Sequence, residues 1–126
     1  IKEWIIKKYS TNQIKNAGKT LIGPENENIE ALEILSFWRT SHASALEYAF
    51  DLLENKTNKI DKYALLAKRL KRTPSIVNKL KRFNSKGMQL STMQDIGGCR
   101  IILSNLKNVD RLIKTLKKER KKDCLN

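Results

Sequence analysis

The chain has 126 residues and a net charge of +13 at pH 7. This length suits one domain with a modest core, or parts of two domains. The positive charge favours polyanionic partners, namely nucleotides, RNA, DNA or an acidic protein, although a merely soluble basic surface has the same composition. No apolar run approaches the roughly 20 residues that cross a bilayer, and charges interrupt the first apolar residues at once. The sequence therefore predicts neither a membrane partner nor a signal peptide.

The cysteine and histidine content argues against metal and redox sites. Cys99 and Cys124 have no metal-ligand or redox spacing, and His42 is the single histidine, which makes a zinc-type cluster unexpected. Two such cysteines fit a reducing compartment, with Cys99 buried and unreactive. We therefore expect a cytoplasmic protein.

The sequence begins with a predicted short helix over residues 1–17. Apolar side chains recur there among lysines, and Gly18 is the expected stop. Gly and Pro within residues 21–24 then predict a turn. The apolar stripe of this helix consists of Trp4, Ile5, Tyr9 and Ile14.

The longest helix is predicted over residues 27–54. Apolar side chains recur at helical spacing along it, and acidic residues near its start complement the helix dipole. Residues 55–60 have the composition of a loop. We therefore divide the chain into a helical region, residues 1–57, and a second region, residues 58–126.

The middle of this helix carries the segment Phe37-Trp38-Arg39-Thr40-Ser41-His42. A tryptophan and a histidine on an amphipathic helix usually lie in the core and at its rim. A substrate-facing role for Arg39 or His42 stays open, because both side chains could point at one ligand from adjacent turns.

From residue 60 the pattern predicts strand, helix, strand and helix. Residues 63–70 fit a helix or a strand on pattern alone, and we choose a strand near their end because a proline follows closely. The residue before a proline is pushed towards an extended conformation, and proline is favoured at the first position of a helix. Thr73 should therefore cap a helix over about residues 74–83.

A second strand is predicted over residues 96–103, after a loop and short linker at residues 84–94. Its apolar centre suggests a buried strand. Gly97 and Gly98 weaken a strand, so they suggest that another backbone or a ligand comes close.

The last predicted helix covers residues 105–122. Within it, residues 107–122 carry eight Lys or Arg and two acidic residues. A charge run of this kind is usually a solvated face, and an RNA-contacting face is the alternative.

The junction between the first strand and the following helix is dense in cations. Arg69 and Lys71 are two residues apart, so on a strand both side chains lie on one face. Ser75 falls in the first turn of the helix, where free N–H groups attract anions, and Lys79 lies one turn further along the same face. Arg binds phosphate oxygens bidentately and Lys adds a point charge. The segment therefore predicts a triphosphate pocket, with a basic surface helix as the alternative.

Asp95 begins the second predicted strand and has glycines on one side. A Mg²⁺ bound to a nucleotide usually takes one or two protein carboxylates together with phosphate oxygens. Asp95 is well placed for that role, although an aspartate before a strand is also a common turn residue.

These segments together resemble the first half of the RelA/SpoT synthetase domain. They read Arg69-x-Lys71-x3-Ser75-Ile76-x2-Lys79 and Asp95-Ile96-Gly97-Gly98-x-Arg100-Ile101-Ile102, where the family reads R-x-K-x3-S-I-x2-K and D-I-x-G-x-R-I. The resemblance covers roughly residues 60–120. The segment from Phe37 to His42 is also similar to what precedes the domain in small single-domain and phage- or toxin-associated members.

The resemblance implies an α+β fold, in which N-terminal helices precede part of a nucleotidyltransferase-like mixed β-sheet. It implies transfer of pyrophosphate from ATP to the 3′-OH of GDP or GTP, which gives (p)ppGpp, with AMP leaving. In a toxin branch of the family the acceptor is the 3′ end of tRNA. The lysine surplus over residues 107–122 leans towards tRNA, and a non-catalytic basic module that binds RNA is a third hypothesis.

The resemblance also assigns roles to individual residues. Asp95 would bind Mg²⁺, and Arg100 would contact phosphate or form a structural salt bridge. The residues expected to hold the ATP phosphates are Arg69, Lys71, Ser75 and Lys79.

The chain departs from the family in its second half. The family has an acceptor-stacking tyrosine and a later glutamate at the metal, but here the last tyrosine is Tyr63 and Glu119 is the one glutamate after Asp95. We therefore expect part of a longer protein, with an incomplete active site and little or no synthetase activity as it stands. A truncated, regulatory or antitoxin-like remnant is the alternative.

Overall fold

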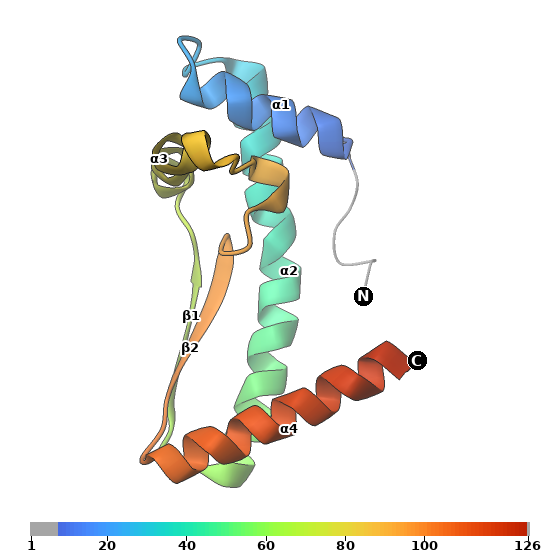
Figure 1. Cartoon of the computed structure of the whole chain (residues 1–126), viewed down its shortest axis with the longest axis vertical. Coiled ribbons are helices and arrows are strands. Elements are labelled where there is room, and N and C mark those ends of the chain that lie inside the picture. Colours follow the sequence, from blue (N-terminus) through green and yellow to red (C-terminus); the bar gives the residue numbers. More distant parts are fainter. Residues whose placement is uncertain (1–7, 126) are drawn as a thin grey trace. The chain divides into compact units, whose positions relative to one another are not determined.

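The computed structural model describes residues 8–125, and for residues 121–125 it describes the backbone alone. In the described residues the fold is α+β, as predicted, and the two strands β1 and β2 pair antiparallel (Figure 1). The predicted stripe residues Trp4 and Ile5 lie outside the described residues. The elements in chain order are α1 (Thr11–Ile22), α2 (Ile29–Ile60), β1 (Leu65–Leu70), α3 (Thr73–Phe83), the short 3-10 helices η2 (Asn84–Lys86) and η3 (Leu90–Thr92), β2 (Gly97–Ile102) and α4 (Leu106–Leu125).

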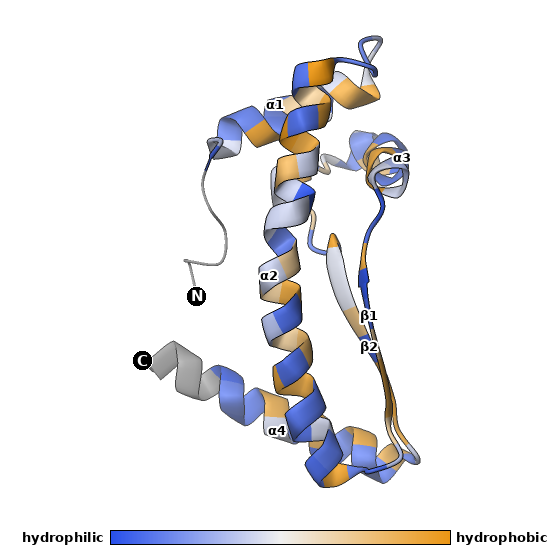
Figure 2. Ribbon diagram, turned by 180° about the vertical axis from the view of Figure 1, so that it is seen from behind, coloured by the Kyte–Doolittle hydropathy of each residue, from blue (hydrophilic) through white to orange (hydrophobic). Residues whose placement is uncertain are grey.

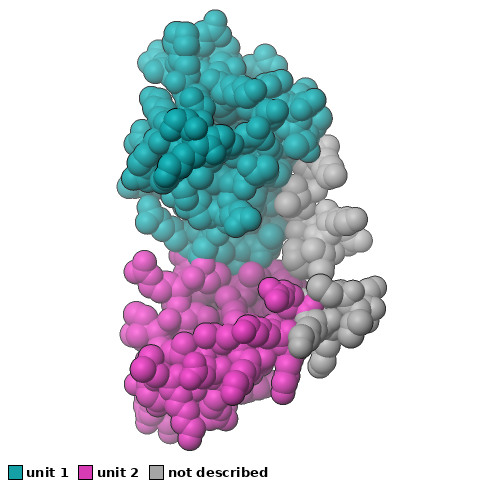
Figure 3. Space-filling view, viewed as in Figure 1, with its two compact units in different colours: residues 1–47, 69–98 teal, residues 48–68, 99–126 magenta. Residues whose placement is uncertain are grey.

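The chain forms two compact units (Figure 3). Unit 1 consists of residues 1–47 and 69–98, and unit 2 consists of residues 48–68 and 99–126. The predicted boundary after residue 57 is not tested by this division and stays a prediction. Each unit is described below by itself.

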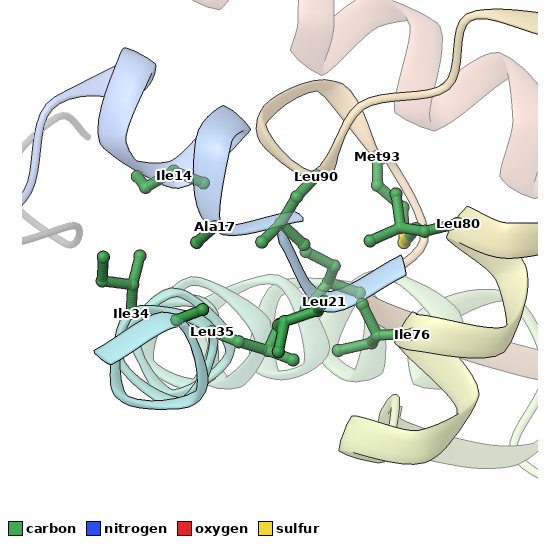
Figure 4. Packing of buried hydrophobic residues seen from close by; sticks show 11 residues of the cluster. Ile14, Ala17, Leu21, Ile34, Leu35, Ile76, Leu80, Leu90 and Met93 are labelled. Carbon is green, nitrogen blue, oxygen red and sulfur yellow. The ribbon is translucent and has the colours of Figure 1, made fainter. Parts of the chain in front are cut away.

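A hydrophobic core lies in unit 1, where α1, α3 and η3 meet the first part of α2 (Figure 4). On α3 the buried residues are Ile76 and Leu80, which lie one turn apart on the same face. The core therefore fixes the rotation of α3, and with it the directions of the cationic side chains on this helix. The side chains of this core that are almost completely buried are Leu21, Leu35, Ile76, Leu80, Leu90 and Ile96.

Gly18 does not stop the first helix, contrary to the prediction. The helix begins after Ser10, whose hydroxyl accepts a hydrogen bond from the Gln13 backbone N–H while the Gln13 side chain accepts one from the Ser10 N–H. It then continues through Gly18 to Ile22. A Cβ on Gly18 would lie 2.8 Å from the Cβ of Leu90, so close packing explains the glycine.

We predict that Gly18→Ala destabilises the protein, although alanine favours a helix by about 1 kcal/mol over glycine. The added methyl group would overlap the Leu90 Cβ, which cannot rotate away, and overpacking of a core typically costs about 1–3 kcal/mol. Urea unfolding should show a lower free energy of unfolding. The control is Gly98→Ala, where a Cβ would meet open space. A Gly18→Ala protein that is more stable than the wild type would contradict the packing argument.

Residues 55–60 are helical, so the predicted loop is wrong. They form the end of α2, and in unit 2 the Thr57 side chain is fully buried. The Lys56 ammonium forms an ion pair with Glu119 of α4 at 3.0 Å. A buried Thr57 and an ion pair with a distant residue thus accompany a helix that the polar composition of the segment does not favour.

Asp61 anchors the segment that follows α2, and sequence reasoning missed it. The residue is 5% exposed, and its carboxylate accepts hydrogen bonds from the Ser104 N–H at 2.6 Å and the Ser104 hydroxyl at 2.9 Å. The Asn108 side-chain amide and the Tyr63 N–H also donate to it, at 3.1 and 3.0 Å. The bond from the Ser104 N–H is the largest cause that lowers the pKa of Asp61, to about 2. Unit 2 therefore has a buried carboxylate that joins the approach to β1 with the start of α4.

We predict that Asp61 contributes to acid unfolding. Because its pKa is lowered in the folded state, its stabilising effect is complete above the ordinary value of 3.8 and is lost as the pH falls through about 2. Thermal unfolding between pH 7 and pH 2 should show a steeper loss of stability for the wild type than for Asp61→Asn. The control is Asp51→Asn, at an exposed position of α2. Parallel curves for the wild type and Asp61→Asn would contradict this role.

The second strand is half-buried, where the sequence predicts a buried strand. Burial alternates along β2 because neighbouring side chains point to opposite faces, and Ile102 is 57% exposed. The expected close approach at the glycines is not found within the described residues. A Cβ on Gly97 would make an ordinary contact with Leu46 at 3.6 Å, and one on Gly98 would have no neighbour within 4 Å.

The last helix agrees with its prediction in position. Hydrophilic residues predominate along α4, with hydrophobic residues at intervals between them (Figure 2). Leu112 is buried, whereas Leu106 is 82% exposed. Among the helices of residues 8–125, none has both the length and the apolar character needed to cross a membrane.

Candidate phosphate-binding site

Three charged side chains from separate segments of unit 1 meet at one oxygen atom. Lys71 follows β1, Lys79 lies on α3 and Asp95 precedes β2. The Lys79 ammonium donates to Asp95 Oδ2 at 2.6 Å, and the Lys71 ammonium donates to the same oxygen at 3.2 Å. Each lysine side chain is 22% exposed and Asp95 is 47% exposed. The carboxylate is therefore the most accessible member of this Lys71–Lys79–Asp95 cluster.

The strand pairing explains why Lys71 and Asp95 are neighbours. The Lys71 N–H donates to the carbonyl oxygen of Ile96 at 2.6 Å, which extends the antiparallel pairing by one residue beyond β1. Ile96 is fully buried in the core, and this burial fixes the position of the backbone to which Lys71 is bonded. Lys71 and Asp95 are thereby brought to the same end of the two-stranded sheet.

The position of Lys79 follows from the packing of α3. It lies between Ile76 and Leu80 in sequence, and those two side chains are buried in the core. Because the buried face of α3 is fixed, the Lys79 side chain reaches Asp95 with most of its length covered. Two ammonium groups are thus held side by side by the fold.

The predicted cap of α3 is wrong by one residue. Thr73 is the first residue of the helix, and Arg72 occupies the cap position with an extended backbone and no capping side-chain hydrogen bond. Pro74 is therefore the second residue of the helix and not, as predicted, the first; it still lies in the first turn, and the half-buried Ser75 follows it. The first-turn N–H groups therefore receive no side-chain cap from Arg72, which favours an anion at this end of the helix.

The electrostatics of the cluster favour an ionised carboxylate and a positive site. The hydrogen bond from Lys79, followed by the hydrogen bond and charge of Lys71, holds the pKa of Asp95 below its ordinary value, while partial burial opposes this shift. Two cations face one anion, so the cluster keeps a net positive charge. Such a site attracts a phosphate group, which can replace the carboxylate as the partner of the lysines.

The other predicted site residues lie in different surroundings. Arg69 is exposed on β1, and Arg100 is exposed on the part of β2 that belongs to unit 2. Arg39 is half-buried, and its Nε donates to the carbonyl oxygen of Lys71 at 2.8 Å. The His42 Nδ1 donates to the Trp38 carbonyl oxygen of its own helix at 2.6 Å. The structure therefore brings Lys71, Lys79 and Asp95 together with Arg39, and the proposed ligand contacts of all these residues stay predictions.

A pocket of about 520 Å³ adjoins the cluster, and the sequence did not predict it. Lys79 and Asp95 contribute to its wall, so the pocket and the cluster share two residues. Its volume is in the range of small-molecule sites. The remaining lining residues are Phe83, Lys86, Gly87, Met88, Thr92, Met93 and Gln94.

The residues present are compatible with a nucleotide-bound Mg²⁺ but not with a site built from protein ligands alone. No group of three or more His, Cys, Asp or Glu side chains suited to a metal occurs among the described residues. Asp95 could supply one carboxylate oxygen, and the other ligands would be phosphate oxygens and water. Mg²⁺ binding is therefore expected to depend on the nucleotide.

Residues 68–124 match the family model described as the region found in RelA/SpoT proteins. The chain carries a RelA/SpoT region. The predicted resemblance to the RelA/SpoT synthetase domain is thereby confirmed for this part of the chain, and the matched residues include the whole Lys71–Lys79–Asp95 cluster. No curated protein matches the chain.

We predict opposite effects of Asp95 and Lys79 on the binding of inorganic tripolyphosphate without divalent metal. Asp95→Asn removes a negative charge that repels the probe, and a unit charge about 4 Å away contributes on the order of 1 kcal/mol even in bulk water, or about fivefold in affinity. Calorimetric titration in EDTA should show tighter binding for Asp95→Asn and weaker binding for Lys79→Met. Asp51→Asn should bind like the wild type. Weaker binding by Asp95→Asn would contradict a direct lysine–phosphate contact.

Proposed function

We propose that the protein is an ATP-dependent pyrophosphokinase that transfers pyrophosphate to the 3′-OH of GDP or GTP. The RelA/SpoT region supports a pyrophosphotransferase-type enzyme of the (p)ppGpp synthetase class at the level of the family. The observation that carries the proposal is the convergence of Lys71 and Lys79 on one Asp95 oxygen. This arrangement provides two cations for a polyphosphate and one carboxylate for its metal.

The proposed reaction is a displacement at the β-phosphorus of ATP. The 3′-hydroxyl oxygen of the acceptor forms a bond to this phosphorus, and the bond between the β-phosphorus and the bridging oxygen to the α-phosphorus breaks. AMP leaves with the bridging oxygen, and the hydroxyl proton passes to a base. Positioning and stabilisation of charge dominate such transfers, because the reacting groups need little covalent help from the protein.

The cluster would change partners when ATP binds. The ammonium groups of Lys71 and Lys79 would move from Asp95 Oδ2 to phosphate oxygens, with Arg69 and the N-terminal turn of α3 at Ser75 as further phosphate contacts. The carboxylate of Asp95 would then be free to bind Mg²⁺, which neutralises the charge that develops on the phosphates. A phosphate contact or a structural salt bridge of Arg100, which belongs to unit 2, stays a prediction.

A second candidate function is modification of the 3′ end of tRNA by the same chemistry. The cationic surface of α4 favours it, because a long polyanion would use charges that a mononucleotide does not need. The exposed basic residues of α4 with described side chains are Lys107, Arg111, Lys114, Lys117, Lys118 and Arg120. A toxin that blocks translation would act in this way.

A single assay separates these functions. The natural protein at its full length is incubated with β,γ-labelled ATP and Mg²⁺, and GDP, GTP and deacylated tRNA are offered in parallel. We expect label on the guanosine nucleotide, loss of transfer in Asp95→Ala, and normal transfer in the control Asp51→Ala. Label on tRNA would support the second candidate.

The same assay contains the outcomes that oppose the proposal. Transfer that survives Asp95→Ala would contradict the role of this carboxylate at the metal. Absence of transfer to every acceptor, with RNA binding that Asp95→Ala does not change, would instead support a non-catalytic RNA-binding module.

A further inference from the structure

Two neighbouring side chains of α2 hold the two chain segments that lead to the Lys71–Lys79–Asp95 cluster. The indole Nε1 of Trp38 donates to the carbonyl oxygen of Leu90 at 3.2 Å. The Nε of Arg39 donates to the carbonyl oxygen of Lys71 at 2.8 Å. The residues joined are 52 and 32 positions apart in sequence, so these bonds are tertiary contacts. Both lie within unit 1.

The Lys71 residue is held from both sides through its backbone. Its N–H donates to the Ile96 carbonyl at 2.6 Å, and its carbonyl accepts from Arg39. The first bond sets Lys71 next to the segment of Asp95, and the second ties it to α2. With both backbone polar groups bonded, the Cα of Lys71 has a defined position from which its side chain reaches Asp95 at 3.2 Å.

The surroundings of the two donors favour a positioning role. Trp38 packs against the hydrophobic core, and its ring makes an edge-to-face contact with His42 at 4.7 Å between centroids. Arg39 is half-buried, and a hydrogen bond from a charged donor to a partly buried acceptor is stronger than a neutral one. His42 thus packs against Trp38, and the Nε of Arg39 is bonded to the protein backbone at Lys71.

We infer that Arg39 is a positioning residue for pyrophosphate transfer, and that it acts by holding the Lys71 backbone so that the Lys71 ammonium meets the ATP phosphates. Trp38 does the same for the segment between Leu90 and Asp95. This inference rests on the proposed function, and it replaces the direct substrate contact that the sequence suggests for Arg39. A misplacement of about 1 Å can lower a rate by about a hundredfold, so loss of this bond is enough to affect catalysis.

The first test is a double-mutant cycle between Arg39 and Lys71, with kcat/KM for ATP as the readout in the natural protein. We expect Arg39→Met to lower kcat/KM by about tenfold to a hundredfold and Arg39→Lys to recover part of the loss, because lysine can donate to the same carbonyl. In a Lys71→Met background, Arg39→Met should lower kcat/KM further by less than about twofold. If the fold-change in kcat/KM of the double variant equalled the product of the two single fold-changes, Arg39 would act independently of Lys71. That result would overturn the inference.

The second test does not require activity. Amide hydrogen exchange of the peptide that contains Lys71 is measured by mass spectrometry in the nucleotide-free protein. Arg39→Met should raise exchange at Lys71 by at least about tenfold, because the chain is released on its carbonyl side. The matched control is Ser41→Ala, which removes a hydrogen bond of 2.8 Å to the Trp38 carbonyl on the same helix and leaves Lys71 untouched.

The two tests separate failure of the inference from failure of the proposed function. Unchanged exchange in Arg39→Met would overturn the positioning role, even if its activity were low, and would indicate a direct contact with substrate. Equal exchange in Arg39→Met and Ser41→Ala would show a general loosening of α2 and would also overturn it. If the wild type transferred no label to any acceptor, the proposed function would fail, and amide exchange alone would then decide whether Arg39 holds Lys71.

Discussion

The hydrophobic core of unit 1 keeps two lysine ammonium groups on the same oxygen of Asp95. Partly exposed ion pairs of this kind contribute only about 0–1 kcal/mol each, so the cluster cannot hold its three segments together. Burial of a single Leu or Ile side chain contributes about 1.5–3 kcal/mol, and the same segments bury Ile76, Leu80 and Ile96 completely or almost so. The core therefore keeps the charges in place, and the charges remain available for a ligand.

The carboxylate has two separable effects in this arrangement. It reduces the repulsion between Lys71 and Lys79, which lets the fold hold two cations close together without a bound anion. In the proposed function it would also compete with a phosphate for the same hydrogen-bond donors, so it would weaken the binding of a metal-free polyphosphate. A metal on the carboxylate would reverse the second effect, because the combined charge at Asp95 would then attract the phosphates.

Local patterns predicted the elements of the site, and contacts between distant residues determined the rest. The strand before Lys71 and the buried face of α3 follow from Pro74 and from apolar residues one turn apart, which are signals within a few residues. Gly18 packs closely against Leu90, and Lys56 of the helical residues 55–60 pairs with Glu119 of α4, so these contacts join residues that no local signal relates. The spacing of Lys71 and Lys79 also does not reveal that both meet Asp95, 24 and 16 residues away.

The use of backbone acceptors by Trp38 and Arg39 has a consequence for binding. A lysine side chain loses about 1.5–2 kcal/mol of rotamer entropy when it is fixed, and a mobile backbone would add about 1–2 kcal/mol for each residue that has to be ordered. Because the Lys71 backbone is held before a ligand arrives, and Asp95 already directs its ammonium group, most of this cost falls on folding. In the proposed function, the binding energy of a polyphosphate would then be left for the groups that react.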